Sequence, residues 1–184
     1  MQGDLIEACP VVVFSEALTF DGGQDLQSMM TALSGAAGLQ SVRSIVMTQA
    51  CDLQQQKVRN VILCPAYALP DYRAAWTTRE QSNAGTQPNE KRWIKHVDEI
   101  KKGRIWNLTM LMKREASANV GLTTLTTIVD FHEVFSVPTP FLRLWIQKTN
   151  QPRLRLRPPY REHLSQGFAR FFMRVGLPVD IEEI

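Results

Sequence analysis

The sequence lacks the two features that mark proteins inserted in a membrane or exported across one. No apolar run approaches the roughly 18 uninterrupted residues that a transmembrane helix needs. The N-terminus, MQGDLIEACP, carries acidic residues where a signal peptide carries Lys or Arg. These absences predict a cytoplasmic protein with no membrane partner.

Cysteine is scarce, which limits the covalent and metal chemistry of the chain. The residues of this type are Cys9, Cys51 and Cys64, an odd number without CxxC spacing. A disulfide framework or a zinc knuckle would need a different pattern, and no HExxH motif is present. We therefore expect reduced thiols, no bound metal and no cofactor.

Lys and Arg are absent from the first 42 residues, which carry five acidic residues and a net charge of −5. Residues 143–174 have the opposite character, with eight Lys or Arg residues against Glu162 alone, a net charge of +7. Such asymmetry can steer a polyanion to the basic end. It can also bring the two ends together, within one chain or between the two chains of a dimer.

At 184 residues the chain is expected to form a single domain, residues 1–184, of the α+β class. Runs rich in β-branched residues at 42–48 and 58–63 flank a short polar segment. This pattern predicts a buried hairpin with a polar tip. Because loops on a rigid scaffold often carry function, the tip is the first place to look for a site.

Apolar spacing predicts two helical regions before the basic end. Leu26, Met29, Met30 and Leu33 share one helical face, which is typical of core packing. Residues 69–102 are predicted to form a helical insert.

The second helix of that insert has an apolar stripe of Trp93, Val97 and Ile100. His96 falls outside this stripe, so we expect it to face solvent.

The basic end begins with Arg153, Arg155 and Arg157, which alternate with Leu154 and Leu156. In an extended chain the three guanidinium groups share one face and the leucines the other. Cations about 7 Å apart match a row of phosphates and fit no buried core. This arrangement predicts a surface that follows the backbone of RNA or DNA.

An amphipathic C-terminal helix over residues 160–175 is predicted to continue this surface. Its apolar stripe consists of Leu164, Phe168, Phe171 and Val175. The candidate nucleic-acid-binding residues are Arg59, Arg153, Arg155, Arg157, Arg161, Arg170 and Arg174. Other interpretations stay open: the basic end is a solvated face, pairs with the acidic N-terminal third, or docks an acidic protein or a second copy of the chain.

The hairpin tip also holds groups capable of catalysis. Cys51 beside Asp52 could act as a nucleophile in a hydrolase if His132 or His163 approached it. The alternative is that Asp52 is a turn former and that Cys51 acts as a small hydrophobe.

Hydrolysis of RNA without a metal needs a base, an acid and cations that stabilise the phosphorane. Asp52, His132, Arg43 and Arg59 are groups of these kinds. They are the candidates for a metal-independent activity.

Three segments carry a resemblance to a known family: Gly3-Asp4-Leu5-Ile6, residues 42–48 and residues 60–65. In order and pattern they resemble the strands of MazF/PemK-type toxins, small SH3-like β-barrels that cleave RNA without metal. The resemblance implies such a barrel here, with Arg43 as a phosphate-binding cation. Ala66 and Tyr67 follow Pro65 where the family has a catalytic Thr or Ser. The resemblance therefore implies a barrel adapted to binding, in an RNA- or DNA-processing protein or a toxin-like defence component.

Overall fold

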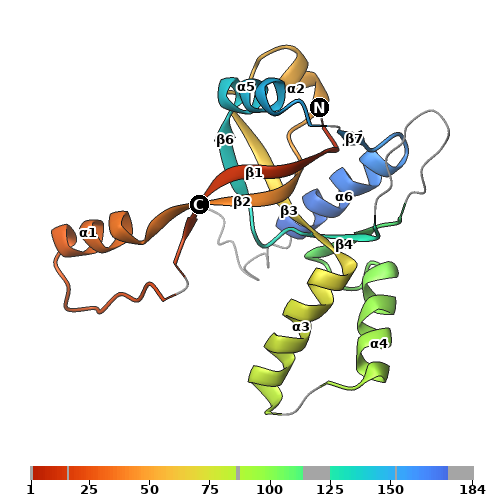
Figure 1. The fold of residues 1–184 in the computed structure, drawn as a ribbon, viewed down its shortest axis with the longest axis horizontal. Helices are drawn as coiled ribbons and strands as arrows, with labels where there is room; N and C mark the ends of the chain where they lie inside the picture. The colour runs from red at the N-terminus through yellow and green to blue at the C-terminus, as the bar shows by residue number, and fades with distance from the viewer. Residues whose placement is uncertain (1, 16, 86–87, 114–124, 152, 174–184) are drawn as a thin grey trace, which may run out of the picture.

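The computed structural model describes residues 2–15, 17–85, 88–113, 125–151 and 153–173. In these residues the chain is a mixed α and β protein with a seven-stranded sheet and six helices (Figure 1). The strands are β1 (Asp4–Phe14), β2 (Ala37–Val46), β3 (Asn60–Ala68), β4 (Leu108–Leu111), β5 (Thr127–Asp130), β6 (Phe135–Pro138) and β7 (Leu154–Arg155). The helices are α1 (Leu26–Ala36), α2 (Ala50–Gln54), α3 (Leu69–Ala84), α4 (Glu90–Lys101), α5 (Thr139–Thr149) and α6 (Tyr160–Phe172).

All strand pairings are antiparallel and follow the order β4-β5-β3-β2-β1-β7, with β6 beside another part of β3. The order ends at β4 and β7, and no pairing joins these two strands within the described ranges. The sheet is therefore not closed by its hydrogen bonds. The SH3-like barrel stays a prediction that these pairings do not confirm.

The predicted central hairpin is present as β2 and β3, which pair side by side between Val46 and Leu63. Its apolar residues enter the core as expected, with Ile45 and Leu63 both fully buried. The polar tip contains the short helix α2, in which Leu53 is 1% exposed and anchors the tip to the sheet.

Two apolar clusters lie on opposite faces of the sheet. The neighbours Leu5 and Ile6 belong to different clusters, because successive side chains of a strand point to opposite faces. Leu53 of α2 and Leu142 of α5 share the cluster of Ile6, whereas Leu164 of α6 shares that of Leu5. Helices α2 and α5 thus cover one face and α6 covers the other (Figure 1). None of the described helices is long and apolar enough to cross a membrane.

The segment predicted as a helical insert holds α3 and α4, which pack through aromatic rings. The rings of Trp76 and Trp93 lie 5.2 Å apart between centroids. His96 stacks on Tyr72 and Trp76, and its Nε2 lies 3.0 Å from the Tyr72 hydroxyl oxygen. The expected solvent exposure of His96 is therefore wrong, because its ring extends the aromatic stripe between the two helices.

This environment makes stability depend on pH. Burial lowers the pKa of His96 below its ordinary value of 6.5. As the pH falls through about 6.5, the unfolded chain takes up a proton that the folded protein resists, so stability is lost. We expect the melting temperature to fall less in His96→Gln than in the parent protein between about pH 7.5 and about pH 5.5.

Circular dichroism melts at both pH values measure this difference. His163→Gln, which changes an exposed residue of α6, is the matched control. If His96→Gln and the parent lose the same number of degrees, the assignment to His96 is contradicted.

The outer parts of β1 and β2 form a two-stranded ribbon that projects from the body and ends in α1 (Figure 1). We call residues 12–40 the arm. The helix predicted here is present, but its expected burial is wrong, because none of its residues is buried and Leu26 is 73% exposed. Apolar spacing predicted the helix correctly and gave no information about what covers it.

Candidate nucleic-acid interface

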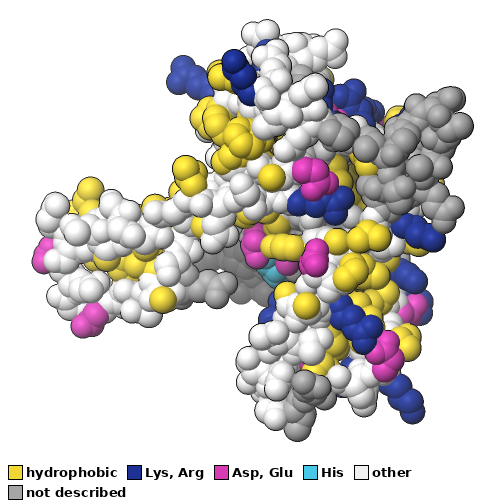
Figure 2. Space-filling view, viewed as in Figure 1, with side chains coloured by type: hydrophobic (Ala, Val, Ile, Leu, Met, Phe, Trp, Pro, Cys, Tyr) yellow, Lys and Arg dark blue, Asp and Glu magenta, His cyan; other side chains and the backbone are white. Residues whose placement is uncertain are grey.

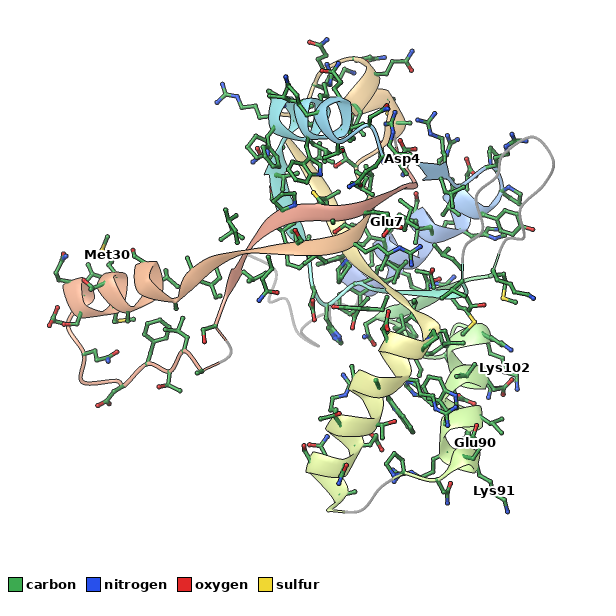
Figure 3. All side chains as sticks on the ribbon, viewed as in Figure 1. Asp4, Glu7, Met30, Glu90, Lys91 and Lys102 are labelled. Carbon is green, nitrogen blue, oxygen red and sulfur yellow. The ribbon has the colours of Figure 1, made fainter. Side chains whose placement is uncertain are left out.

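A buried carboxylate organises two of the predicted arginines. Strand β7 pairs with the start of β1, which places Arg155 directly opposite Asp4. Figure 3 labels Asp4 at this end of β1. Arg155 donates from Nε and Nη2 to the two carboxylate oxygens of Asp4, the second over 3.1 Å, and Arg153 donates from Nη1 over 3.4 Å. Asp4 is only 2% exposed, and a charge so deeply buried needs such partners. The hydrogen bonds to Asp4 raise the pKa of the Arg155 guanidinium.

The predicted alternation along this strand is confirmed. Arg153, Arg155 and Arg157 are exposed, while Leu154 and Leu156 pack against an apolar cluster. The statement that such cations fit no buried core needs correction, because two of them hold the buried Asp4. One interpretation left open was that the basic end pairs with the acidic N-terminal third. The ion pairs of Arg153 and Arg155 with Asp4 are such a contact.

Arg143 of α5 joins this group and was not a sequence candidate. Its Nη2 donates to the Leu53 carbonyl over 3.2 Å. Together with Asp4 it lines a small cavity of about 20 Å³. The cations around Asp4 therefore outnumber the carboxylate that orients them. The only sequence signal for Arg143 was the excess of basic residues after position 142.

An open groove of about 690 Å³ extends from Arg143 to Arg59. Amide side chains of Gln56, Asn60 and Gln147 also line it, and no Asp or Glu is among the described residues that do so. Arg143 lines both this groove and the cavity above Asp4, so it connects them. Figure 2 shows Lys and Arg side chains in dark blue over the end of the molecule where α2 and α5 lie. We call Arg59, Arg143, Arg153, Arg155 and Arg157 the arginine surface.

The remaining basic candidates lie on α6 or beyond it. Arg161 donates to Glu162 over 2.7 Å, and Arg170 is exposed on the helix that covers the opposite face of the sheet. Arg174 lies outside the described residues, as does Val175. The three other members of the predicted apolar stripe pack against the sheet as expected.

The two candidate nucleophilic groups of the hairpin tip make local contacts. Cys51 is exposed, and its Sγ lies 3.6 Å from Gln49 Oε1 and 3.7 Å from Asp52 Oδ1. Cys9 and Cys64 are buried, and desolvation raises the pKa of these thiols to about 11 and about 12.

The histidines are engaged elsewhere. The ring of His132 meets Phe171 edge-on at 5.0 Å, and its Nδ1 lies 3.6 Å from Asp130 Oδ1. Among the described residues, no hydrogen bond, ion pair or ring contact joins a histidine to Cys51 or Asp52. The residues that the structure describes also contain no group of three His, Cys, Asp or Glu side chains placed to hold a metal ion.

Arg43, the cation implied by the toxin resemblance, is held between strands. Its Nε donates to Glu7 over 2.7 Å and its Nη1 to the Thr127 hydroxyl over 3.3 Å. Thr127 supplies a hydroxyl near this arginine, but it is only 2% exposed and donates to the Leu125 carbonyl. A phosphate that binds Arg43 through Nε or Nη1 would have to displace Glu7 or Thr127.

Comparison with known proteins found no matching family model, no similar curated protein and no similar solved structure. The resemblance to MazF/PemK-type toxins therefore stays a prediction. What the described residues define is a mixed α and β protein whose basic end is ordered by a buried aspartate.

Proposed function

We propose that the protein binds nucleic acid, with the arginine surface holding the phosphates of the backbone. The observation that carries this proposal is the surplus of guanidinium groups around Asp4. One carboxylate fixes Arg153 and Arg155 in place, yet their side chains remain 38% and 54% exposed.

The chemistry of these side chains favours phosphate as the ligand. A guanidinium has five N–H donors in a planar fork that suits phosphate oxygens. Arg155 uses Nε and Nη2 for Asp4, which leaves Nη1 available to an outer ligand. A guanidinium already held by a buried carboxylate loses little side-chain entropy when it binds.

The groove between Arg59 and Arg143 supports binding of an extended ligand. Its amide side chains can donate hydrogen bonds to phosphate, sugar or base edges. The absence of carboxylates from its lining removes the repulsion that a polyanion would meet.

The proposed role is binding, without cleavage by this chain. Arg43 is held by Glu7 and Thr127, and Cys51 has no histidine among its contacts in the described parts of the chain. In an RNA- or DNA-processing complex or a toxin-like defence system, the chain would hold the nucleic acid on which another component acts.

Arg59→Glu and Arg157→Glu should each weaken binding of labelled single- and double-stranded RNA and DNA. Both residues are exposed and neither holds Asp4, so these variants test binding without disturbing the fold. The slope of log K against log salt is negative, and removing one arginine–phosphate interaction should make it shallower by about 0.7 to 0.9. Fluorescence anisotropy over a series of salt concentrations gives affinity and slope together.

Lys91→Glu on α4 is the matched control, because it makes the same change in net charge on a helix far from Asp4 (Figure 3). It should leave the slope unchanged. Binding that is absent, insensitive to salt, or equally weakened by Lys91→Glu would contradict the proposal.

A further inference from the structure

The arm exposes a group of large apolar side chains. Those that are 43% to 76% exposed are Val12, Phe14, Phe20, Leu26, Met30, Leu33 and Leu39. Figure 3 shows Met30 on α1, away from the body of the molecule. Since an isolated two-stranded ribbon is marginally stable in water, an arm of this composition calls for a covering surface.

The size of this apolar surface matches one side of a stable protein interface. At about 100 Å² of accessible surface for each half-exposed large side chain, the seven residues present roughly 700 Å². Stable complexes bury about 800 Å² on each partner.

The charge of the arm selects the kind of partner. Helix α1 contains no charged residue, and neither do residues 8–15 or 37–42. Figure 2 shows no Lys or Arg on the arm. A nucleic acid therefore finds no cation here. The acidic residues of the arm, Glu16, Asp21 and Asp25, precede α1 in the sequence and lie outside both strands, so the apolar stripe of α1 can be covered without burying a charge of its own.

A groove of about 810 Å³ lies at the base of the arm and has apolar side chains on both walls. The arm contributes Val12, Phe14 and Leu39 to one wall, and the body contributes Val134 and Phe135 to the other. On α1, Leu26, Met30 and Leu33 lie at i, i+4 and i+7 and so form one exposed stripe. The helix thus has an apolar stripe without a groove, and the base of the arm has a groove of mixed lining without an occupant among the described residues. Its polar part includes Gln40, His132 and Glu133.

We propose that the chain forms a two-fold dimer in which α1 of each copy docks in the groove at the base of the other copy's arm. The helix lies at the tip of the arm and the groove at its base, so two antiparallel arms form both contacts at once. Such a self-complementary arrangement closes at two subunits. The dimer does not depend on the proposed nucleic-acid binding, because the arm and the arginine surface share no residue.

The test is the mass of the full chain in solution, measured by sedimentation at concentrations from about 1 to about 100 µM. The parent protein should have about twice the chain mass of 20.9 kDa. The Leu26→Glu/Leu33→Glu variant should raise the dimer dissociation constant at least about 30-fold, because buried charges replace two apolar side chains. Both residues are exposed within the monomer, so circular dichroism should report an unchanged fold.

Thr31→Glu adds a charge to the other face of α1 and should leave the dimer intact. Val134→Glu, in the groove wall, should produce a monomer. Mixing Val134→Glu with Leu26→Glu/Leu33→Glu should restore a dimer, because the mixed pair keeps one intact contact between helix and groove. A parent protein that is monomeric at every concentration, or a dimer that survives both sets of substitutions, would overturn the proposal.

Discussion

Replacing both Arg153 and Arg155 by glutamine should lower the free energy of unfolding by about 3 kcal/mol. The reason is the position of Asp4, which is 2% exposed and would lose both guanidinium partners. For a chain of this length the melting temperature should fall by roughly 6 to 12 °C. Urea unfolding followed by circular dichroism measures the change directly.

Two further variants show whether the loss comes from the buried carboxylate that has lost these two partners. Adding Asp4→Asn to the double variant should recover part of the lost stability, since the buried charge is then absent. Arg43→Gln breaks a pair whose acidic partner, Glu7, is 50% exposed, and should cost no more than about 1 kcal/mol. A triple variant no more stable than the double one would show that Asp4 does not depend on these arginines.

The same pair explains why the site was only partly predictable from the sequence. Alternation of Arg and Leu identified the exposed face of residues 153–157, because period-two patterns follow directly from strand geometry. The opposite charges of the two chain ends indicated that they attract. Neither pattern could place residue 4 opposite residue 155, since strand register depends on pairing across about 150 residues.

Sequence patterns were most informative where the residues within one strand or helix are enough to determine its secondary structure. The runs that predicted β2 and β3 are strongly β-branched, and the stripe that predicted α6 contains Leu164 and Phe168, which pack as expected. Strand β1 is harder to predict in this way, because a bulge between Ile6 and Cys9, with Ala8 at φ 49°, interrupts the alternation of its side chains.

The arm and the α3–α4 pair show what such patterns leave open. Leu26 and Met30 had the spacing of a core helix but lie on a helix that contacts no core. His96 lay outside an apolar stripe but stacks between aromatic rings. In both cases the missing information was tertiary, because amphipathic spacing defines a face and not its partner.

Phe131→Ala should destabilise the protein by about 3 to 5 kcal/mol, the range for removing a large aromatic ring from a core. Phe131 is 1% exposed and meets Phe168 of α6 edge-on at 5.6 Å. Helix α6 approaches this ring closely at Gly167, where an added Cβ would lie 3.4 Å from Phe131 Cε2. Removing the ring therefore leaves a cavity under α6 that the helix cannot fill without shifting.

Urea unfolding gives the size of this loss, and amide hydrogen exchange shows whether it is concentrated in α6. Phe172→Ala is the matched control, because Phe172 also contacts Phe168 but is 54% exposed, so its removal should cost about 1 kcal/mol. Equal effects of the two substitutions would contradict the role given to Phe131. The groove between Arg59 and Arg143 lies on the face of the sheet opposite α6, so Arg59→Glu should change the salt slope by the same amount in Phe131→Ala, below its melting temperature, as in the parent protein.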